Sequence, residues 1–453
     1  MIARPAALAE LVASMHNGAV KIITGIRRSG KSYLLDQIFG AYLKKQGVHK
    51  DHIIRVSLDL DQFEELQNPR RLSEYIKKRL KKDGKMNYVF IDEIQNSYKV
   101  KKLGVDEAEI AEEDKDSIWL TFYDVLNSLN VIRNVDVYVT GSNSKMLSED
   151  IATNFRGRRT EIKLHPLSFS EFFAWKGGDK SDAWQEYMTF GGLPQVVLAK
   201  SNAQKASTLE ELFEKVYLKD VVDRHAIKDA ALLDSVVSVV CSSVGSLTNP
   251  SKLEKILCDR REKSPSVPTL RKFLGYLVDA YLLRKADRYD VRGKKHLDYP
   301  SKYYAEDLGI RNWRLGFREQ EETHLMENAI YNELIRRGYA VDVGVVEIEH
   351  REEGTRELRQ HEIDFVVNTG FTKVYIQSAY GMNNPEQRSR EVLPLNKTGD
   401  SFRKLVITNG NQKPWTDEYG ILHVGLYPFL LDSVILENLI NRPAEERVIG
   451  EDS

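Results

Sequence analysis

The chain has 453 residues, a length that indicates about two to four domains rather than a single hydrophobic core. Its 66 lysine and arginine residues nearly balance its 67 acidic residues, which excludes a globally basic nucleic-acid coat protein and confines any nucleic-acid contact to a local patch. The two cysteines, Cys241 and Cys258, provide neither a disulfide framework nor a paired zinc motif, and no segment reaches ~20 apolar residues, so we expect a folded cytoplasmic protein without a membrane span.

Residues 1–165 alternate short β-branched runs with helical stretches, a pattern typical of a parallel sheet covered by helices. The predicted strands are residues 20–24, 53–58, 88–91, 135–140 and 161–164. A charged stretch at 99–117 lacks apolar periodicity, which indicates a solvated surface insertion. This part of the chain is therefore predicted to form one α/β unit.

The string GIRRSGKS at residues 25–32 matches the G-x-x-x-x-G-K-[ST] template of a phosphate-binding loop. A predicted strand precedes it and a helix begins near Lys31, so backbone N–H groups and a helix N-terminus would converge on a β-phosphate. Lys31 would neutralise the β- and γ-phosphate oxygens, and Ser32 would place its hydroxyl on Mg²⁺. The alternative, a glycine-rich turn without a ligand, does not account for the flanking strand and helix. The residues expected to contact the nucleotide are Gly25, Ile26, Arg27, Arg28, Ser29, Gly30, Lys31, Ser32 and Tyr33.

Two adjacent acids, Asp92 and Glu93, follow the predicted hydrophobic strand 88–91. Open α/β sheets bind ligands at the carboxyl ends of their strands, so Asp92 is expected in the metal shell. Glu93 would orient and deprotonate the attacking water. Without the phosphate loop, a solvated turn would be the better interpretation of these acids.

Two further groups could complete the site. The loop GSNSK after strand 135–140 offers three polar side chains that could face a γ-phosphate, of which Asn143 is favoured, although a plain turn fits each of them equally well. Arg156, Arg158 and Arg159 precede the next strand, and Arg158 is the candidate for reaching a transition-state phosphate in its own or a neighbouring subunit. A surface or ion-pair role is an equal alternative for each arginine.

The rival nucleotide is GTP, because NKTG at residues 396–399 is similar to the guanine-reading motif Asn-Lys-x-Asp. Gly399 stands where that motif needs an acid, and the segment lies far beyond the phosphate loop. The acidic pair Asp92 and Glu93 is typical of ATPases with a catalytic glutamate. ATP with Mg²⁺ is therefore the predicted ligand.

Beyond residue 165 the sequence changes character. Residues 166–230 are helical and aromatic, which indicates a lid or linker. Residues 231–318 contain predicted helices at 251–258 and 269–283, followed by a polar, turn-rich segment, and this order has the outline of a winged helix. Helix 321–337 then precedes strands that indicate a second α/β unit over residues 319–453, and the strands are 341–347, 362–367, 374–377, 404–408 and 421–425.

Residues 251–300 hold a local basic surplus, 13 basic against 7 acidic side chains. The residues that could meet the phosphates of double-stranded DNA are Arg271 and Lys272 on the second helix, and Arg292, Lys294 and Lys295 in the turn-rich segment. Winged helices also serve as packing or subunit-contact modules, so DNA binding and packing both stay open.

Together these residues resemble a family of bacterial and archaeal AAA+-like ATPases whose C-terminal half is known only as a domain of unknown function. The resemblance implies an ATPase core, a small helical lid, a winged-helix segment and a C-terminal domain similar to restriction-endonuclease-like folds, and it leaves the client and homo-oligomeric assembly open. The motifs that carry it are GIRRSGKS at 25–32, FIDEIQ at 90–95, TGSNSKML at 140–147, RGR at 156–158, HPLSFSEFF at 165–173, FGGLP at 190–194 and VYLKDVVDR at 216–224.

Nucleases of the resembled fold place acids and a lysine in the C-terminal unit, where this chain has Glu327, Asp364 and Gln377. Gln377 replaces one acid and Ala379 stands in place of the lysine, so metal-dependent cleavage is not expected and a catalytically silent partner-binding domain is favoured. Asp364 would then face solvent or hold a local hydrogen bond.

Two functions remain from the sequence. One is an ATPase whose Mg²⁺-dependent hydrolysis drives a conformational switch on an unknown client, DNA or protein. The alternative is an ATP-dependent DNA- or protein-binding scaffold with little turnover. Glu93 favours hydrolysis.

Overall fold

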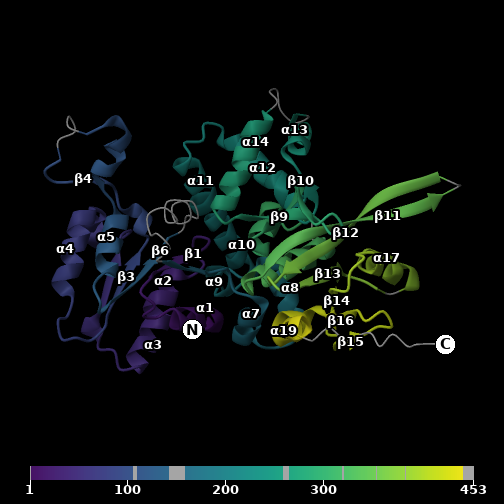
Figure 1. The fold of residues 1–453 in the computed structure, drawn as a ribbon, viewed down its shortest axis with the longest axis horizontal. Helices are drawn as coiled ribbons and strands as arrows, with labels where there is room; N and C mark the ends of the chain where they lie inside the picture. The colour runs from purple at the N-terminus through teal and green to yellow at the C-terminus, as the bar shows by residue number, and fades with distance from the viewer. Residues whose placement is uncertain are drawn as a thin grey trace.

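The computed structural model describes residues 2–105, 110–141, 159–258, 265–318, 321–352, 355–382 and 384–441. Figure 1 shows a smaller amino-terminal sheet and a larger carboxy-terminal sheet, with helices between them. Among these residues no helix is both long and apolar enough to cross a bilayer.

The amino-terminal sheet has the strand order β2-β3-β6-β1-β7, and every pair in it is parallel. Its strands are β1 (Val20–Thr24), β2 (Ile53–Ser57), β3 (Asn87–Asp92), β6 (Val135–Thr140) and β7 (Arg159–Lys163). The five predicted strands are thus confirmed to within two residues at each end.

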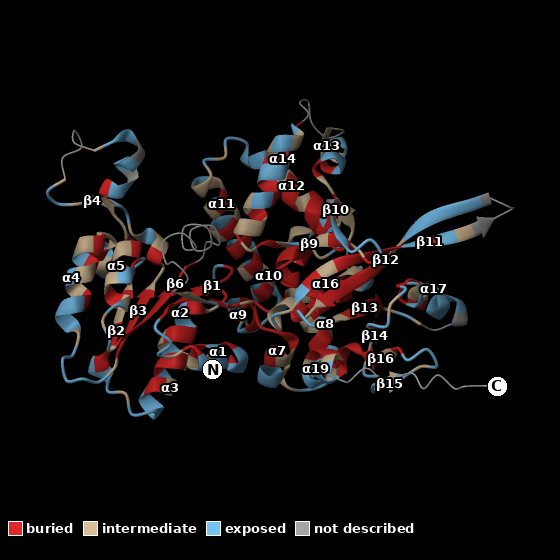
Figure 2. Cartoon of the chain, viewed as in Figure 1, coloured by how far each residue is buried: buried red, intermediate tan, exposed pale blue. Residues whose placement is uncertain are grey.

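Helices cover both faces of this sheet, so the apolar side chains of β1 and β6 are buried along their whole length. One face packs on α1 (Pro5–Ala13) and on a continuous helix of three segments, α2 (Lys31–Tyr33), η1 (Leu34–Phe39) and α3 (Gly40–Lys45). The other face packs on α4 (Pro69–Arg79) and α5 (Phe122–Asn130). Figure 2 shows the buried strands between these helices, the α/β/α layering predicted from the sequence.

The predicted insertion at 99–117 leaves the sheet as a short ribbon of β4 (Val100–Lys101) and β5 (Trp119–Leu120), with a 3₁₀ segment at Glu112–Ile118. Most of its described side chains are exposed, as the charge pattern predicts.

The segment after β7 is helical, as predicted for residues 166–230. Its helices are α7 (Phe169–Lys176), α8 (Lys180–Phe190), α9 (Pro194–Val197), α10 (Asn202–Glu211), η7 (Leu212–Leu218) and α11 (Lys219–Arg224). Ser168 begins α7 with a capping box, in which its hydroxyl accepts from the Glu171 amide and the Glu171 carboxylate accepts from the Ser168 amide. This cap explains the SFSE sequence at the start of the helical segment.

The next segment combines four helices, a short strand and a hairpin. They are α12 (Ala230–Ser242), β8 (Leu247–Thr248), α13 (Pro250–Cys258), α14 (Val267–Asp279), β9 (Leu283–Asp290), β10 (Lys295–Ala305) and α15 (Leu308–Arg314). The predicted helix 269–283 extended too far, because α14 ends at Asp279, Tyr281 adopts a left-handed φ of 56° and Leu283 already belongs to β9. The chain therefore reverses earlier than the apolar periodicity indicated.

The carboxy-terminal sheet has nine strands in the order β15-β16-β14-β13-β12-β11-β9-β10-β8. Its remaining strands are β11 (Ala340–Glu352), β12 (Thr355–Asn368), β13 (Lys373–Ala379), β14 (Arg403–Thr408), β15 (Trp415–Thr416) and β16 (Leu422–Gly425). One face packs on α16 (Glu322–Arg336), α18 (Leu426–Leu431) and α19 (Val434–Asn441), and the other packs on α17 (Pro385–Asn396). The second α/β unit is therefore present.

The β9–β10 hairpin belongs to this sheet as well. β9 pairs in parallel with β11, with Arg288 opposite Val343, and the Val291 amide donates to the Val345 oxygen at 3.0 Å. The sheet thus continues across residue 318, where the sequence predicts a domain boundary.

Candidate nucleotide-binding site

The loop between β1 and the helix that begins at Lys31 has the backbone geometry that its two glycines permit. Gly25 has a φ of 138°, and a Cβ there would lie 2.1 Å from the Leu164 oxygen. Gly30 has a left-handed φ of 97° and caps the helix. Any other residue at Gly25 would collide with the chain after β7, so this glycine lets the loop approach the sheet edge closely.

Lys31 is buried, with only 4% of its surface exposed. Its Nζ donates to the Gly25 oxygen at 3.1 Å and to the Ile26 oxygen at 3.2 Å, so the ammonium is held against the loop itself. Burial lowers the pKa of Lys31, and the carboxylates of Glu93 and Asp92 oppose that shift.

Asp92 is the last residue of β3 and Glu93 follows it, at the same edge of the sheet. Asp92 accepts a hydrogen bond from the Thr140 hydroxyl and a second one from the Ser57 hydroxyl at 3.3 Å. The Thr140 oxygen in turn accepts from the Glu93 amide at 3.0 Å, and Glu93 has a left-handed φ of 51°. Thr140, the last residue of β6, therefore fixes both acids.

Thr140 is a site residue that sequence reasoning missed. The loop after β6 drew attention to residues 142–144, but the position beside the acids is the last residue of the strand. The missing information was that β6 pairs in parallel with β3. Knowledge of this pairing would have identified Thr140, because the carboxyl ends of neighbouring parallel strands lie side by side.

Ser32 and Asp92, the two expected metal ligands, line one cavity of about 260 Å³ together with Ser57. A serine hydroxyl and one carboxylate are a set that suits Mg²⁺, which keeps several waters and binds substrate phosphates. In the described part of the chain, no group of three or more His, Cys, Asp or Glu side chains could hold a metal ion. The Ser32 hydroxyl and the Asp92 carboxylate fit a metal ion whose other ligands are water and phosphate oxygens.

A larger cavity of about 550 Å³ also borders the loop, and its lining combines polar and apolar side chains. The loop residues 27–33 and Glu93 contribute polar groups. Ile2, Leu167, Pro194 and Leu198 add an apolar wall from the amino terminus and the helical segment. A cavity lined by both phosphate-binding groups and apolar side chains suits a nucleotide.

The helical segment contacts the loop directly. Arg27 forms an ion pair with Asp220 of α11 at 3.4 Å, and the Tyr217 hydroxyl donates to the Arg27 oxygen at 3.0 Å. Arg4 adds a second connection, because it donates to the Ser29 oxygen at 3.3 Å and pairs with Glu171 of α7 at 3.2 Å. The loop is therefore connected to α7, η7 and α11 of the helical segment.

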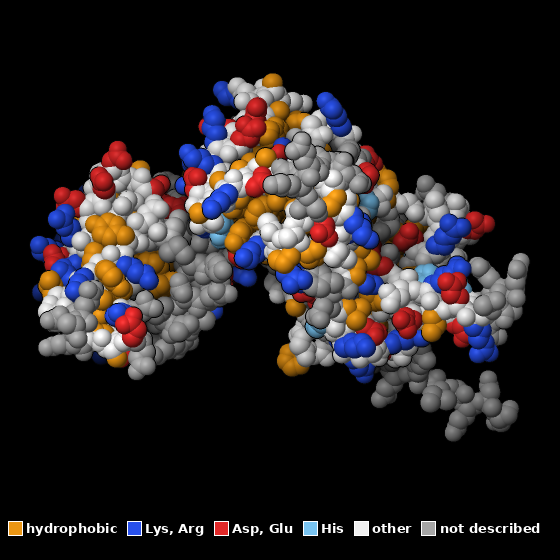
Figure 3. All heavy atoms as spheres, turned by 90° about the horizontal axis from the view of Figure 1, so that it is seen from above, with side chains coloured by type: hydrophobic (Ala, Val, Ile, Leu, Met, Phe, Trp, Pro, Cys, Tyr) orange, Lys and Arg blue, Asp and Glu red, His pale blue; other side chains and the backbone are white. Residues whose placement is uncertain are grey.

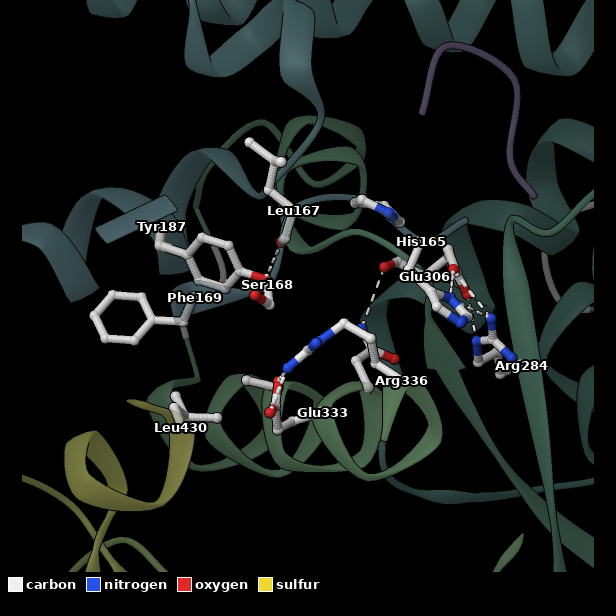
Figure 4. A pocket seen from close by; sticks show the side chains of 13 residues that line it. His165, Leu167, Ser168, Phe169, Tyr187, Arg284, Glu306, Glu333, Arg336 and Leu430 are labelled. Carbon is white, nitrogen blue, oxygen red and sulfur yellow. Dashed lines mark hydrogen bonds and ion pairs between the residues drawn. The ribbon is translucent and has the colours of Figure 1, made fainter. Parts of the chain in front are cut away.

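A buried ionic cluster joins the chain after β7 to the carboxy-terminal sheet. Figure 4 shows His165 and Arg284 directed at Glu306, and the three residues line a small cavity of about 30 Å³. Nδ1 of His165 lies 2.8 Å from Glu306, and Arg284 forms an ion pair with the same carboxylate. Burial alone would raise the pKa of Glu306, but Arg284 and His165 lower it to about 2.

The next residue, Asp307, anchors the FGGLP turn. Its carboxylate accepts from the Gly192 amide at 2.7 Å and from the Ile310 amide at 3.2 Å. A Cβ at Gly191 would lie 2.1 Å from an oxygen of Asp307, so the turn packs too closely for a side chain. Burial raises the pKa of Asp307 to about 6.

Two catalytic candidates cannot be placed. Asn143 and Arg158 lie outside the described residues, as do Ser142, Ser144 and Arg156. Arg159 begins β7 and is half-buried.

The carboxy-terminal acids do come together, around a lysine that the sequence did not indicate. Lys302 of β10 donates to Glu327 at 2.8 Å, forms an ion pair with Glu362 and lies 3.8 Å from Asp364. Asp364 is only 8% exposed. Of the two predicted roles for Asp364, the local hydrogen bond is confirmed and solvent exposure is wrong, because the Ser378 amide donates to its carboxylate at 2.8 Å.

The basic residues of 251–300 differ in their surroundings. Arg271 and Lys272 are exposed on α14, and Lys294 and Lys295 are exposed at the hairpin. Arg292 is also exposed, but its guanidinium donates to the Lys397 oxygen at 2.7 and 3.1 Å, which ties the hairpin to the end of α17.

Family models match three consecutive parts of the chain. An AAA domain matches residues 17–173, and two domains of unknown function, DUF8612 and DUF4143, match residues 181–321 and 322–427. An uncharacterized protein of Haemophilus influenzae is 31% identical over 436 residues, 95% of this chain and 99% of its own length. The uncharacterized protein MJ1544 of Methanocaldococcus jannaschii is 26% identical over 410 residues, 87% of this chain and 81% of its own length.

Solved structures superpose on this chain only loosely. A Walker-type ATPase of Pyrococcus abyssi aligns with a TM-score of 0.45 and 14% identity, over 70% of this chain and 96% of that one. The ORC1 protein of Aeropyrum pernix in complex with DNA aligns with a TM-score of 0.27 and 11% identity, over 70% of this chain and 93% of that one. Superpositions this loose add no argument about ligand or partner.

Proposed function

Because the chain belongs to the same family as the Haemophilus influenzae protein, with an AAA domain followed by two domains of unknown function, we propose that it is an Mg²⁺-dependent ATPase. The observation that supports this most is the convergence of Lys31, Asp92 and Glu93 at one edge of the parallel sheet. Hydrolysis would drive a conformational switch on a client.

Each of these residues has a role that follows from its chemistry. Lys31 neutralises the β- and γ-phosphate oxygens, and the loop amides bind the β-phosphate. Ser32 and Asp92 would hold Mg²⁺, which would supply positive charge beside the phosphates. Glu93 takes the proton of the attacking water, and the Thr140 hydroxyl keeps its backbone in place. Asn143 and Arg158 complete the proposal, as the groups that face the γ-phosphate.

ATP is favoured over GTP on two grounds. First, the acidic pair Asp92 and Glu93 at the end of β3 is typical of ATPases. Second, the NKTG sequence, which is similar to the guanine-reading motif, lacks the acid of that motif and lies at the end of α17 in the carboxy-terminal unit. The apolar wall of Ile2, Leu167 and Pro194 offers a surface for a nucleotide base.

The alternative is an ATP-dependent scaffold with little turnover. The contacts of Arg27 with Asp220 and Tyr217 support a lid that responds to the nucleotide, which both functions need. Steady-state hydrolysis, measured with and without duplex DNA, separates them, because a scaffold binds ATP without sustained phosphate release. Mass measurement with and without ATP then tests homo-oligomerisation.

The rest of the proposal concerns the domains. We assign residues 1–165 to the ATPase core, 166–230 to the lid, 231–318 to a winged-helix module and 319–453 to a catalytically silent, nuclease-like domain. The order α12, β8, α13, α14, β9, β10 supports the winged helix, and the exposed Arg271, Lys272, Lys294 and Lys295 support duplex DNA as a partner.

A further inference from the structure

A two-stranded arm extends beyond the carboxy-terminal sheet. β11 and β12 pair along their whole length, from Ala340 opposite Asn368 to Glu352 opposite Thr355. β9 pairs only with residues 343–345 of β11, and β13 pairs only with residues 365–368 of β12. The outer edge of β12 before residue 365 therefore has no neighbouring strand within the described chain.

Figure 1 shows the end of this arm projecting past the rest of the molecule, and Figure 2 shows that it is exposed. Each residue from Arg356 to Gln360 is exposed, and Leu358 is 67% exposed. An open strand edge presents N–H and C=O groups that can pair with another strand. A large apolar side chain at the middle of such an edge adds apolar surface that a pairing strand would cover.

The charges beside Leu358 decide which partner fits. Natural strand edges often carry charges of one sign, which repel a second copy. Here Glu357 and Arg359 flank Leu358 with opposite signs, and they pair with each other within the strand at 2.8 Å. An edge that carries both signs symmetrically about its centre is complementary to itself.

We propose that the outer edge of β12 pairs with the same edge of a second copy of this chain, antiparallel and centred on Leu358. In that register Glu357 lies opposite Arg359 of the second copy, and Arg359 lies opposite Glu357 of the second copy. Leu358 lies opposite its own equivalent, and Arg356 lies opposite Gln360. Directly opposite residues share a face of the sheet, so the two ion pairs and the leucine pair form together. The contact is isologous, so it closes as a dimer.

The proposed contact is small, so it is weak and depends on protein concentration. Interfaces below about 1,200 Å² are typical of transient complexes. The arm is remote from the phosphate loop, and the proposal does not depend on ATP hydrolysis. Self-association through β12 is therefore expected in the full-length protein without nucleotide.

Sedimentation velocity of the nucleotide-free protein, over about a hundredfold range of concentration, tests the proposal. The wild type should shift from monomer to dimer. Glu357→Arg and Arg359→Glu should each weaken the dimer by about tenfold or more, since each places like charges in both cross-strand pairs. Leu358→Pro should abolish it, because proline removes an edge N–H. Glu418→Arg, an exposed charge change at the β15–β16 turn, should behave as the wild type.

Mixing the two charge variants gives the decisive result. Each variant carries one sign at both positions, so opposite charges meet only in the mixed dimer. Fluorescently labelled Glu357→Arg protein should associate with Arg359→Glu protein at least as tightly as the wild type self-associates. The proposal is overturned by a wild type that stays monomeric, by single variants that associate like the wild type, or by a mixture that does not associate.

Discussion

The Gly192 amide donates to the buried carboxylate of Asp307 at 2.7 Å. Gly192 belongs to the turn that leads into Pro194 of the nucleotide cavity, and Asp307 follows the β9–β10 hairpin. One hydrogen bond thus joins the wall of the candidate ATP site to the carboxy-terminal sheet.

This bond gives a pH-dependent prediction for Asp307→Asn. Burial raises the pKa of Asp307 from 3.8 to about 6, so the folded state holds the proton more tightly than the unfolded chain. Its contribution to the free energy of unfolding is therefore complete below about pH 4 and is lost as the pH rises to about 6. The full change is about 3 kcal/mol, at ~1.4 kcal/mol per pKa unit.

Urea denaturation of the wild type and Asp307→Asn between pH 4 and 7 measures this change. The wild-type stability minus that of the variant should fall with rising pH. The same difference for Asp432→Asn, an exposed control, should stay flat. Glu306 does not interfere, because Arg284 and His165 hold its pKa at about 2. If the wild-type stability minus that of Asp307→Asn stays flat or rises with pH, the raised pKa of Asp307 is contradicted.

Lys302→Met should destabilise the carboxy-terminal sheet strongly. It leaves the buried carboxylates of Glu327 and Asp364 and the partly exposed carboxylate of Glu362 without their cation, and breaking one partner of a buried ion pair costs about 3–5 kcal/mol. Chemical denaturation should show this loss, whereas Lys295→Met, at an exposed position of the same strand, should be nearly neutral. Adding Glu327→Gln to Lys302→Met should recover part of the stability, and no recovery would mean that the lysine acts by packing alone.

The carboxy-terminal domain should not cut DNA. Ala379 stands where the resembled nucleases have a lysine, and Lys302 is engaged in a buried ion pair with Glu327. Plasmid DNA incubated with the purified protein in Mg²⁺ or Mn²⁺ should stay intact. Metal-dependent cutting that disappears in Asp364→Ala would show the silent-domain proposal to be wrong.

Duplex DNA, if it is a partner, should be bound by some basic residues and not by others. Arg271→Ala and Lys272→Ala should each reduce the slope of log affinity against log salt by roughly one, because each would remove a phosphate contact. Arg292→Ala should change the slope least, since that guanidinium is bound to the Lys397 oxygen. Equal effects of all three substitutions would argue against contacts made by Arg271 and Lys272 but not by Arg292. No detectable binding at low salt would favour a packing role for the winged-helix module.

The sequence predicted the amino-terminal sheet well because its strands are short, continuous and β-branched, and because the phosphate loop imposes a strand before it and a helix after it. Gly25 and Gly30 adopt the backbone that the motif needs, and Asp92 and Glu93 end β3 as expected. Thr140 was missed because its role depends on β6 lying beside β3, which single-strand patterns do not encode.

The carboxy-terminal half was harder to predict for the same reason. Lys302 is separated by 25 residues from Glu327 and lies on a strand whose local pattern is polar, so nothing near it in sequence indicated an ion pair. The pairing of β9 with β11 likewise joins segments that local patterns treated as separate domains. Asn143 and Arg158 remain predictions, because they lie outside the described residues.

The roles of Lys31 and Glu93 separate binding from chemistry. Lys31→Ala removes the main cation for the phosphates and should weaken ATP binding, whereas Lys45→Ala, an exposed position at the end of α3, should not. Glu93→Gln keeps the size and hydrogen-bonding capacity of the side chain but removes the base. ATP should therefore still bind to Glu93→Gln while hydrolysis falls by a factor on the order of 10²–10⁴.

The most direct test of the ATPase proposal is a single-turnover measurement with radiolabelled ATP and Mg²⁺ on the wild type and Glu93→Gln, with bound nucleotide and released phosphate followed in the same samples. We expect the wild type to convert bound ATP to ADP and phosphate, and Glu93→Gln to retain ATP uncleaved. Hydrolysis by Glu93→Gln at the wild-type rate, or a wild type that binds ATP and never releases phosphate, would contradict it.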